Sequence, residues 1–210
     1  METRTKKETV HRHLYNALAD EYKKRAVNTL TESDLIAKAQ WLKAMSPWEN
    51  VLEIGVGWGN MNKLLSDVGF KTTGIDIAEK MIENARALNP KGKFIVGDYA
   101  QMQTGEKYDA IAGLAFIHLF APEEARNLLL KMYNDLADGG VLHLTTTKED
   151  QYSYAAYNKQ DYGENCHRFR AKHTPESFLN LLKSTPFKVE WLDIQDGAYG
   201  KQRMWLRARK

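Results

Sequence analysis

The stretch of this chain that decides its fold is VLEIGVGWGN, residues 51–60. A short apolar run ends there in three glycines at alternate positions, and apolar residues at helical spacing follow, namely Met61, Leu64, Leu65 and Val68. This pattern predicts a strand, a tight turn and a helix. Glycine is favoured in such a turn when a ligand approaches the main chain closely, because a Cβ would collide with it.

A second apolar segment, residues 71–76, ends in a carboxylate at Asp76. That carboxylate follows the first glycine by about 20 residues, the offset at which an acidic side chain can bind ribose hydroxyls. The two features together predict a site for an adenosine-containing cofactor. A phosphate-binding P-loop is excluded, because no Gly-Lys-Ser/Thr follows the glycines.

The glycine spacing and one acidic residue distinguish among adenosine cofactors. A dinucleotide-binding turn has its third glycine where this chain has Asn60, whereas here the third glycine is Gly59. Glu53 lies inside the strand, where its carboxylate would repel a pyrophosphate but could face a cationic group. Both departures favour S-adenosylmethionine, which carries an ammonium and a sulfonium and no phosphate, over NAD.

Five motifs in this order resemble the class I S-adenosylmethionine-dependent methyltransferases of the small-molecule type. They are residues 52–59, 74–77, 97–100, 108–111 and 136–142. The resemblance implies an α/β fold, a Rossmann-like three-layer sandwich whose seven-stranded sheet is mostly parallel, with an antiparallel last strand and an N-terminal helical lid. It also implies an enzyme that transfers the methyl group of S-adenosyl-L-methionine and releases S-adenosyl-L-homocysteine.

The same resemblance assigns residues to the cofactor. In this family the glycine loop holds the methionine part, the acidic end of the second strand binds the ribose, and an acidic residue after the third strand touches the adenine amine. The residues implied at the cofactor are Tyr15, Tyr22, Glu53, Gly55, Gly57, Gly59, Asp76, Ile77, Met81, Asp98, Tyr99 and Leu114. Tyr15 and Tyr22 resemble a lid that closes over the sulfonium, and packing of an amphipathic helix on the sheet is the alternative.

The chain is predicted to form a single methyltransferase domain of four segments. They are a helical lid at 1–46, a cofactor-binding core at 47–148, a substrate loop at 149–173, and a C-terminal helix with two strands at 174–210. Apolar patterns predict further strands at 71–76, 93–97, 109–116, 141–145, 187–194 and 202–208. A capping pattern at Thr31 predicts a helix that runs on through Leu42.

The segment 149–173 is predicted to be a long aromatic and basic loop over the acceptor site. The candidate substrate-binding residues are Tyr152, Tyr157, Tyr162, Arg168 and Arg170, together with His118 after the fourth strand. Tyrosine faces could hold a cationic or planar acceptor. The two arginines could instead clamp a carboxylate or a phosphate. A disordered loop without a substrate role is the remaining alternative.

Catalytic groups are harder to choose, because a sulfonium is already an activated leaving group and alignment alone can suffice. His118 falls just after the fourth strand, where the family places residues near the methyl acceptor, and a neutral imidazole there could accept a proton. His167 and the hydroxyl of Tyr22 are the other candidates. His143 lies within a predicted buried strand and is expected in the core.

Composition and charge limit which cofactors and which cellular location are expected for the protein. The chain has 210 residues, one cysteine and a formal net charge of +3. A single cysteine argues against disulfides and cysteine-rich zinc sites, and no metal is expected. No apolar stretch approaches the ~20 residues of a membrane span, and the N-terminus does not resemble a signal peptide, so a cytoplasmic enzyme is predicted. A monomer or homodimer is expected. Both ends are locally basic, which indicates either solvated edges or a rim that attracts an anionic substrate.

The acceptor is predicted to be a small-molecule metabolite or natural product that is methylated at oxygen or nitrogen. The Asn/Asp-Pro-Pro-aromatic motif of amine-methylating nucleic-acid enzymes is absent, since residues 113–116 read GLAF. An RNA methyltransferase is the main alternative, although the mild charge by itself implies no nucleic acid. A noncatalytic cofactor-binding subunit and an NAD-dependent oxidoreductase are the others.

Overall fold

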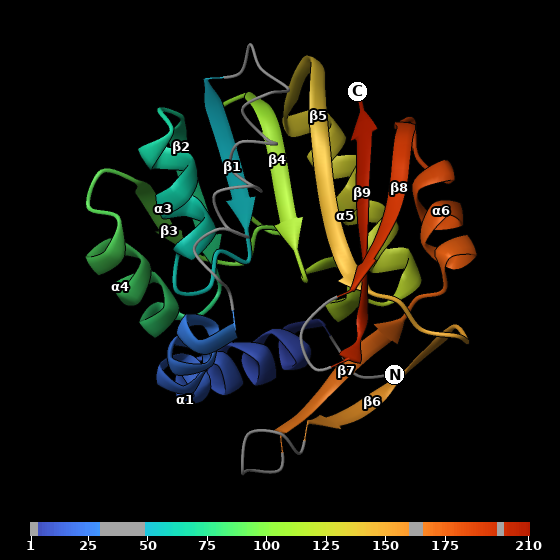
Figure 1. Cartoon of the computed structure of the whole chain (residues 1–210), viewed down its shortest axis with the longest axis horizontal. Coiled ribbons are helices and arrows are strands. Elements are labelled where there is room, and N and C mark those ends of the chain that lie inside the picture. Colours follow the sequence, from blue (N-terminus) through green and yellow to red (C-terminus); the bar gives the residue numbers. More distant parts are fainter. Residues whose placement is uncertain (1–3, 30–48, 160–165, 197–199) are drawn as a thin grey trace. The chain divides into compact units, whose positions relative to one another are not determined.

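A computed structural model of the chain describes residues 4–29, 49–159, 166–196 and 200–210 (Figure 1). The described residues form two compact units, one of residues up to Gln103 and one of residues from Thr104 on. The helix predicted from Thr31 through Leu42 lies outside the described residues.

The first unit carries the glycine turn. Its elements are α1 (Arg4–Thr29), β1 (Asn50–Ile54), α3 (Asn60–Asp67), β2 (Lys71–Asp76), α4 (Glu79–Leu88) and β3 (Lys93–Val96). β1 pairs in parallel with β2, and β2 pairs in parallel with β3. The carboxyl ends of these strands therefore meet at one edge, which is where ligands bind in sheets of this kind. The strand predicted at residues 71–76 is confirmed with the same bounds.

Two helices of the first unit approach each other closely at a glycine. α3 buries Met61 and Leu65, and α4 buries Ile82 and Ala85. Gly59 precedes α3 with φ of 91°, and a Cβ built on it would lie only 2.7 Å from the Cβ of Ala85. Glycine is therefore required at this position by packing as well as by the left-handed backbone.

Helix α1 docks on α4 through Asn16. The side-chain amide of Asn16 donates to Oε2 of Glu79 at 2.6 Å, and its Oδ1 accepts from the N–H of Lys80 at 2.9 Å. The N-cap residue of α4 is Ala78, which has no side-chain oxygen to accept such a bond. Asn16 thus supplies from another helix the acceptor that a serine or aspartate N-cap would offer. Ala19 packs in one apolar cluster with Ala78 beneath this contact.

The second unit contains the remaining elements. They are β4 (Tyr108–Leu114), the 3-10 helix η1 (Ile117–Leu119), α5 (Pro122–Asp135), β5 (Leu136–Thr147), β6 (Ser153–Lys159), β7 (Cys166–Lys172), α6 (Pro175–Lys183), β8 (Lys188–Asp196) and β9 (Gln202–Arg209). β4 and β5 are parallel, whereas β9 is antiparallel to both β5 and β8. The predicted antiparallel last strand is therefore confirmed. Helix α6 lies beside β8 (Figure 1).

The strand order of the main sheet is β3-β2-β1-β4-β5-β9-β8. The pairings β1–β2, β2–β3 and β4–β5 are parallel, and the last strand of the chain runs against its neighbours. This is the mostly parallel, Rossmann-like α/β fold that the motifs predict. Within the described ranges, no helix combines the length and the apolar character needed to cross a membrane.

The segment predicted as a long loop, residues 149–173, is largely an antiparallel hairpin. β6 and β7 pair along seven residue pairs and form a two-stranded sheet of their own. The rings of Tyr154 and Phe169 stack across the hairpin with centroids 5.7 Å apart. The loop prediction is wrong because cross-strand pairs of this kind stabilise strands, and the partners lie too far apart in sequence to be recognised as a pair.

Strand β5 also begins earlier than predicted, at Leu136 rather than at residue 141. Leu136 pairs with Tyr108, and the register then shifts before Ala110 pairs with Val141. The intervening Asp-Gly-Gly sequence is typical of a turn. Leu136 satisfies the apolar spacing of the preceding helix as well, so the sequence alone favours the later start.

Candidate functional site

The glycine turn follows β1 in the first unit. Gly55 and Gly57 have φ of 69° and 56°, in the left-handed region that residues with a Cβ disfavour. The N–H groups of Gly55 and Val56 donate to the carbonyl oxygen of Ile75 at 2.8 and 3.1 Å, which ties the turn to β2. Among the described atoms, none lies within 4 Å of the Cβ that an alanine would add at Gly57. The backbone of the turn can therefore be approached by a ligand.

The carboxylate of Asp76 is held in one orientation at the end of β2. Its Oδ2 accepts from the N–H of Gly57 at 2.9 Å, and its Oδ1 accepts from the N–H of Ala78 at 3.0 Å. Burial raises the pKa of Asp76, and these N–H groups oppose that shift. Each carboxylate oxygen can accept more than one hydrogen bond, so both remain able to bind hydroxyl donors.

Glu53 differs from its sequence-based expectation in its charge. The side chain is 3% exposed, and burial raises its pKa to about 8 even though polar groups of Asn62 oppose the shift. The negative charge of Asp76 adds to the shift. Glu53 is therefore mainly protonated at neutral pH in the cofactor-free protein, and a cation beside it would favour its ionised form.

Sequence reasoning missed the buried polar network behind Glu53. Oδ1 of Asn62 accepts from Oγ1 of Thr72 at 2.9 Å and from the amide of Asn89 at 3.0 Å. All three side chains are buried. The available signal was an asparagine at a core position of the helix, beside Met61 and one turn before Leu65. A buried amide in such a pattern indicates a hydrogen-bonded network.

The third acidic residue of the predicted cofactor site, Asp98, follows β3. Its Oδ1 accepts from the N–H of Ala100 at 3.0 Å, and its carbonyl oxygen accepts from Gln101 at 2.9 Å. The N–H of Gly97 donates to the carbonyl oxygen of Asp76 at 2.9 Å, so this turn is joined to the end of β2. The ring of Tyr99 is buried, and contact of its main chain with the adenine stays a prediction.

Tyr15 and Tyr22 of α1 pack against the first unit. Their ring centroids are 5.8 Å apart in an edge-on arrangement, and both rings contact the cluster of Ala19, Ala78 and Met81. The two tyrosines therefore pack against residues of α1 and of the start of α4, whereas the alternative expected packing on the sheet. Their predicted action as a lid over the sulfonium stays a prediction.

A strained turn leads from β4 to His118 in the second unit. After Leu114, Ala115 has φ of 54°, a conformation that is rare without glycine. Its N–H donates to the carbonyl oxygen of Thr145 at 3.1 Å and to Oγ1 of the same residue at 2.9 Å. Two bonds to one residue of β5 hold this turn, and η1 follows it. Such strain is often found at functional sites.

His118 is a buried, neutral imidazole. It is 5% exposed, and its Nδ1 lies 3.3 Å from Oγ1 of Thr146. Burial lowers the pKa of His118 well below its usual value, and the charges of Arg170, Arg168, His173 and Arg203 lower it further. His118 can accept a hydrogen bond or a proton, but in the free protein it is a weak base.

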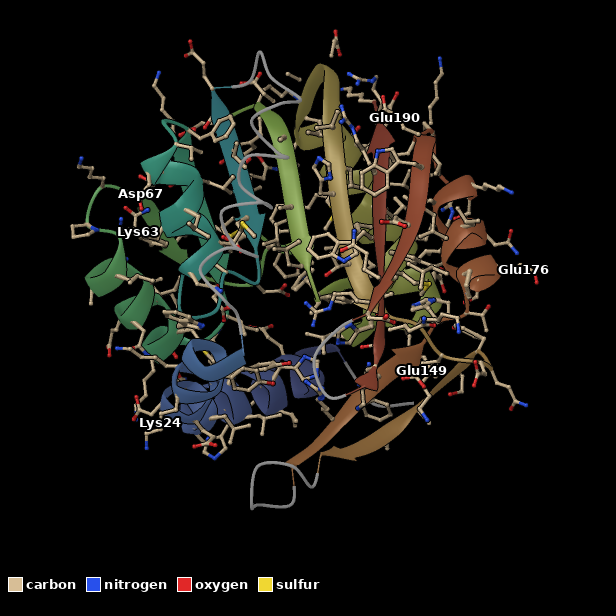
Figure 2. All side chains as sticks on the ribbon, in the orientation of Figure 1. Lys24, Lys63, Asp67, Glu149, Glu176 and Glu190 are labelled. Atoms are coloured by element: carbon tan, nitrogen blue, oxygen red, sulfur yellow. The ribbon has the colours of Figure 1, made fainter. Side chains whose placement is uncertain are left out.

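The hairpin brings two of the predicted substrate-binding residues into this neighbourhood. Arg168 is 6% exposed. The side chain of Arg170 is 11% exposed and forms an ion pair at 3.8 Å with Glu149, which is labelled in Figure 2. Tyr152 is 44% exposed, with its ring centroid 5.5 Å from that of His173.

Two other predicted residues, Tyr157 and His167, lie on the hairpin strands β6 and β7. In the hairpin ladder Tyr157 lies opposite Arg168, and His167 lies opposite Asn158. Tyr162 lies outside the described residues. His143 is buried in β5 as predicted, and burial lowers its pKa to about 3.

Comparison with known proteins identifies the central part of the chain. Residues 51–140 match the family model described as a methyltransferase domain. A trans-aconitate 2-methyltransferase of Paracidovorax citrulli is 32% identical over 102 residues, which are 47% of this chain and 38% of that protein. A malonyl-[acyl-carrier protein] O-methyltransferase of Anoxybacillus flavithermus is 30% identical over 173 residues, which are 80% of this chain and 63% of that protein. The chain thus spans 38% to 63% of the length of the curated relatives it matches.

A solved structure extends the likeness to the whole chain. The 1,6-didemethyltoxoflavin-N1-methyltransferase of Burkholderia thailandensis, with bound S-adenosylhomocysteine, superposes with a TM-score of 0.79 and 14% identity over 100% of this chain and 91% of that one. At that identity the likeness concerns the fold. Residues 51–140 thus carry a methyltransferase domain, and the superposition shows that the chain has the fold of an S-adenosylmethionine-dependent methyltransferase. For this stretch of the chain the family predicted from the motifs is confirmed.

Proposed function

We propose that this protein transfers the methyl group of S-adenosyl-L-methionine to an oxygen or nitrogen atom of a small-molecule metabolite or natural product, without a metal. The observation that carries the proposal is the carboxylate of Asp76, which accepts from the N–H of Gly57 at 2.9 Å beside an open turn. A strand-end carboxylate and a glycine turn are the paired features that bind an adenosine cofactor.

The residues of the first unit fit a cofactor that carries a cation. In the described part of the chain, the buried Oε2 of Glu53 has no hydrogen-bond partner. An ammonium group could supply one, and its charge would favour the ionised side chain. We assign the glycine turn to the methionine part, Asp76 to the ribose, and Asp98 with the main chain of Tyr99 to the adenine.

Methyl transfer from a sulfonium requires mainly that the protein align the acceptor with the methyl group. When bound, the cofactor supplies a methyl group on a sulfonium, which is already a good leaving group. The residues at the acceptor therefore need mainly to orient it and exclude water. We propose that His118 receives the proton if the acceptor must lose one. Tyr22 and His167 are the other candidates.

The names of the relatives support an acceptor other than nucleic acid. They refer to trans-aconitate, to a malonyl-acyl carrier protein and to 1,6-didemethyltoxoflavin. The net charge of +3 is mild for a nucleic-acid enzyme. We further propose that the protein acts in the cytoplasm as a monomer or homodimer.

Calorimetric titration of the whole chain with S-adenosylhomocysteine tests the proposal, with NADH as the competing ligand. We expect binding of S-adenosylhomocysteine alone, and loss of affinity in Asp76→Asn. Asp67→Asn is the matched control, because Asp67 is an exposed carboxylate of the same unit that pairs with Lys63 on α3 (Figure 2). Binding of NADH instead, or equal affinities in the two variants, would overturn the proposal. Detection of S-adenosylhomocysteine release with candidate acceptors then identifies the methylated molecule.

A further inference from the structure

We propose that Arg168, Arg170 and Arg203 form a binding site for an anionic group of the methyl acceptor, a carboxylate or a phosphate. This inference rests on the proposed function, since it names the chemistry of the acceptor. The residues that carry it all belong to the second unit.

The hairpin register places two of the arginines together. Arg168 and Arg170 are two positions apart on β7, and alternate residues of a strand project from the same face. Phe169, between them, belongs to the opposite face and stacks on Tyr154. The hairpin thus has an aromatic face and a basic face. β7 also contacts η1, the short helix that carries His118.

The third arginine, Arg203, is the second residue of β9. Arg203 lies opposite Thr147 at the end of β5, and Thr147 follows the residue whose hydroxyl contacts His118, Thr146. Burial lowers the pKa of Arg203, so its guanidinium is partly withdrawn from water. Sequence reasoning placed Arg203 only in a basic C-terminal stretch, and β-sheet pairing brings it to this cluster.

Burying these guanidinium groups costs free energy unless charged or polar groups compensate for the lost water. Guanidinium groups that are withdrawn from water require charged or polar partners. Elsewhere in the unit Arg207 illustrates a structural solution, because its Nε lies 2.5 Å from Oε2 of Glu190. Arg170 has a looser ion pair with Glu149, at 3.8 Å, and the glutamate side chain is 29% exposed. An ion pair of this length to a partly exposed carboxylate is weak, so a ligand carboxylate could exchange with it.

The charged groups that act on His118 all act in the same direction. The charged groups that shift the pKa of His118 are Arg170, Arg168, His173 and Arg203, and each lowers it. At neutral pH the three arginines make the potential at the imidazole more positive. His173 is then largely neutral, since burial lowers its pKa to about 4. A positive potential in a site of low exposure stabilises an anion.

The geometry of guanidinium favours oxyanions in particular. Its planar fork of N–H donors matches a carboxylate or a phosphate and can bind either through two parallel hydrogen bonds. A cationic acceptor, which the tyrosines of the hairpin could also attract, would be repelled by three arginines. A bound anion would in addition offset the field on His118 and make the imidazole a stronger base.

The test measures binding of citrate and of inorganic phosphate to the full chain by calorimetry, alongside S-adenosylhomocysteine. Arg168→Gln, Arg170→Gln and Arg203→Gln are compared with Lys172→Gln. Lys172 is an exposed cation of β7, two positions after Arg170 and therefore on the same face of the strand. Its substitution controls for the loss of one positive charge. We expect each arginine variant to lose affinity for one of the two probes roughly tenfold, while Lys172→Gln keeps it. The probe that binds shows whether the site prefers carboxylate or phosphate.

A second experiment measures the pKa of His118 from the pH dependence of its ring NMR signals, with and without the probe. We expect the pKa of His118 to rise when the preferred probe binds, and to respond less in Arg168→Gln. An equal loss of affinity in Lys172→Gln would overturn the inference, because it would indicate diffuse surface attraction. Binding of S-adenosylhomocysteine without binding of either probe would overturn the inference and leave the proposed function intact. Binding of a probe without S-adenosylhomocysteine would overturn the proposed function and with it the assignment to a methyl acceptor.

Discussion

The main-chain N–H of Gly57 donates a hydrogen bond to Oδ2 of Asp76 at 2.9 Å. This bond joins the turn after β1 to the carboxylate at the end of β2. The conformation of the glycine turn and the orientation of the carboxylate are consequently set together. A ligand that needs both groups finds them already arranged, which reduces the entropy cost of binding.

Replacing Asp76 with alanine is expected to weaken cofactor binding. The change removes the acceptor for the ribose hydroxyls and also frees the N–H of Gly57, so the loss should be about 1–3 kcal/mol. Calorimetry with S-adenosylhomocysteine measures it, and Asp67→Ala on α3 is the control. Unchanged affinity in Asp76→Ala would refute the ribose assignment.

Glu53 is expected to make the stability of the cofactor-free protein depend on pH. Its pKa is raised from 4.5 to about 8 by burial, so the folded state holds a proton that the unfolded state releases in this window. Stability should therefore fall as pH rises from 4.5 towards 8 and level off above that. Asp76, whose pKa is also raised, contributes in the same direction.

Urea unfolding at a series of pH values measures this dependence. Glu53→Gln keeps the shape of the side chain but cannot ionise. Its free energy of unfolding should therefore fall less steeply with pH than that of the wild type, between the two pKa values of about 4.5 and 8. Glu83→Gln, at an exposed position of α4, should leave the slope unchanged. Parallel wild-type and Glu53→Gln profiles would show that Glu53 is ionised in the folded protein.

Gly59→Ala is expected to destabilise the first unit by about 2–4 kcal/mol, because it combines left-handed strain with overpacking. The added Cβ would lie 2.7 Å from the Cβ of Ala85. Gly69→Ala separates the two effects, since Gly69 has φ of 99° but no described atom within 4 Å of its added Cβ. Equal losses of unfolding free energy in the two variants would mean that α3 and α4 can move apart without cost.

Asn16→Ala is expected to loosen α1 at a cost of about 1 kcal/mol, as for a lost helix cap. Faster amide hydrogen exchange in α1 and at the start of α4 would report the change. The pKa of Glu79, which the amide of Asn16 lowers, should rise in the same variant. Lys23→Ala, at an exposed position of α1, is the control, and similar exchange in both variants would contradict a docking role for Asn16.

Tyr22→Phe tests whether the tyrosines act in catalysis beyond packing. The ring and its edge-on contact with Tyr15 are retained, so affinity for S-adenosylhomocysteine should be unchanged. If the hydroxyl faces the reaction, kcat should fall, by about tenfold for one lost hydrogen bond. Tyr15→Phe provides the comparison, and wild-type turnover in Tyr22→Phe would leave this residue a packing role.

Sequence patterns predict the first unit well because its chemistry is local. Strand β2 has its predicted bounds, and the glycine turn and Asp76 fall where the residue types require them. Prediction failed at residues 149–173, where a hairpin replaces the loop. Strands β6 and β7 are each stabilised by pairing with the other. Local sequence patterns do not reveal which residues will pair.

The sequence by itself determined the family, the sheet with its antiparallel last strand, and the residue types of the glycine turn. These follow from local requirements: a left-handed backbone needs glycine, and periodic apolar residues need a buried face. Only the tertiary structure decided that burial raises the pKa of Glu53 and that the charges of Arg168 and Arg203 both lower the pKa of His118. Charge state and clustering depend on burial and on strand pairing between residues far apart in the chain, so they emerge only when the chain is folded.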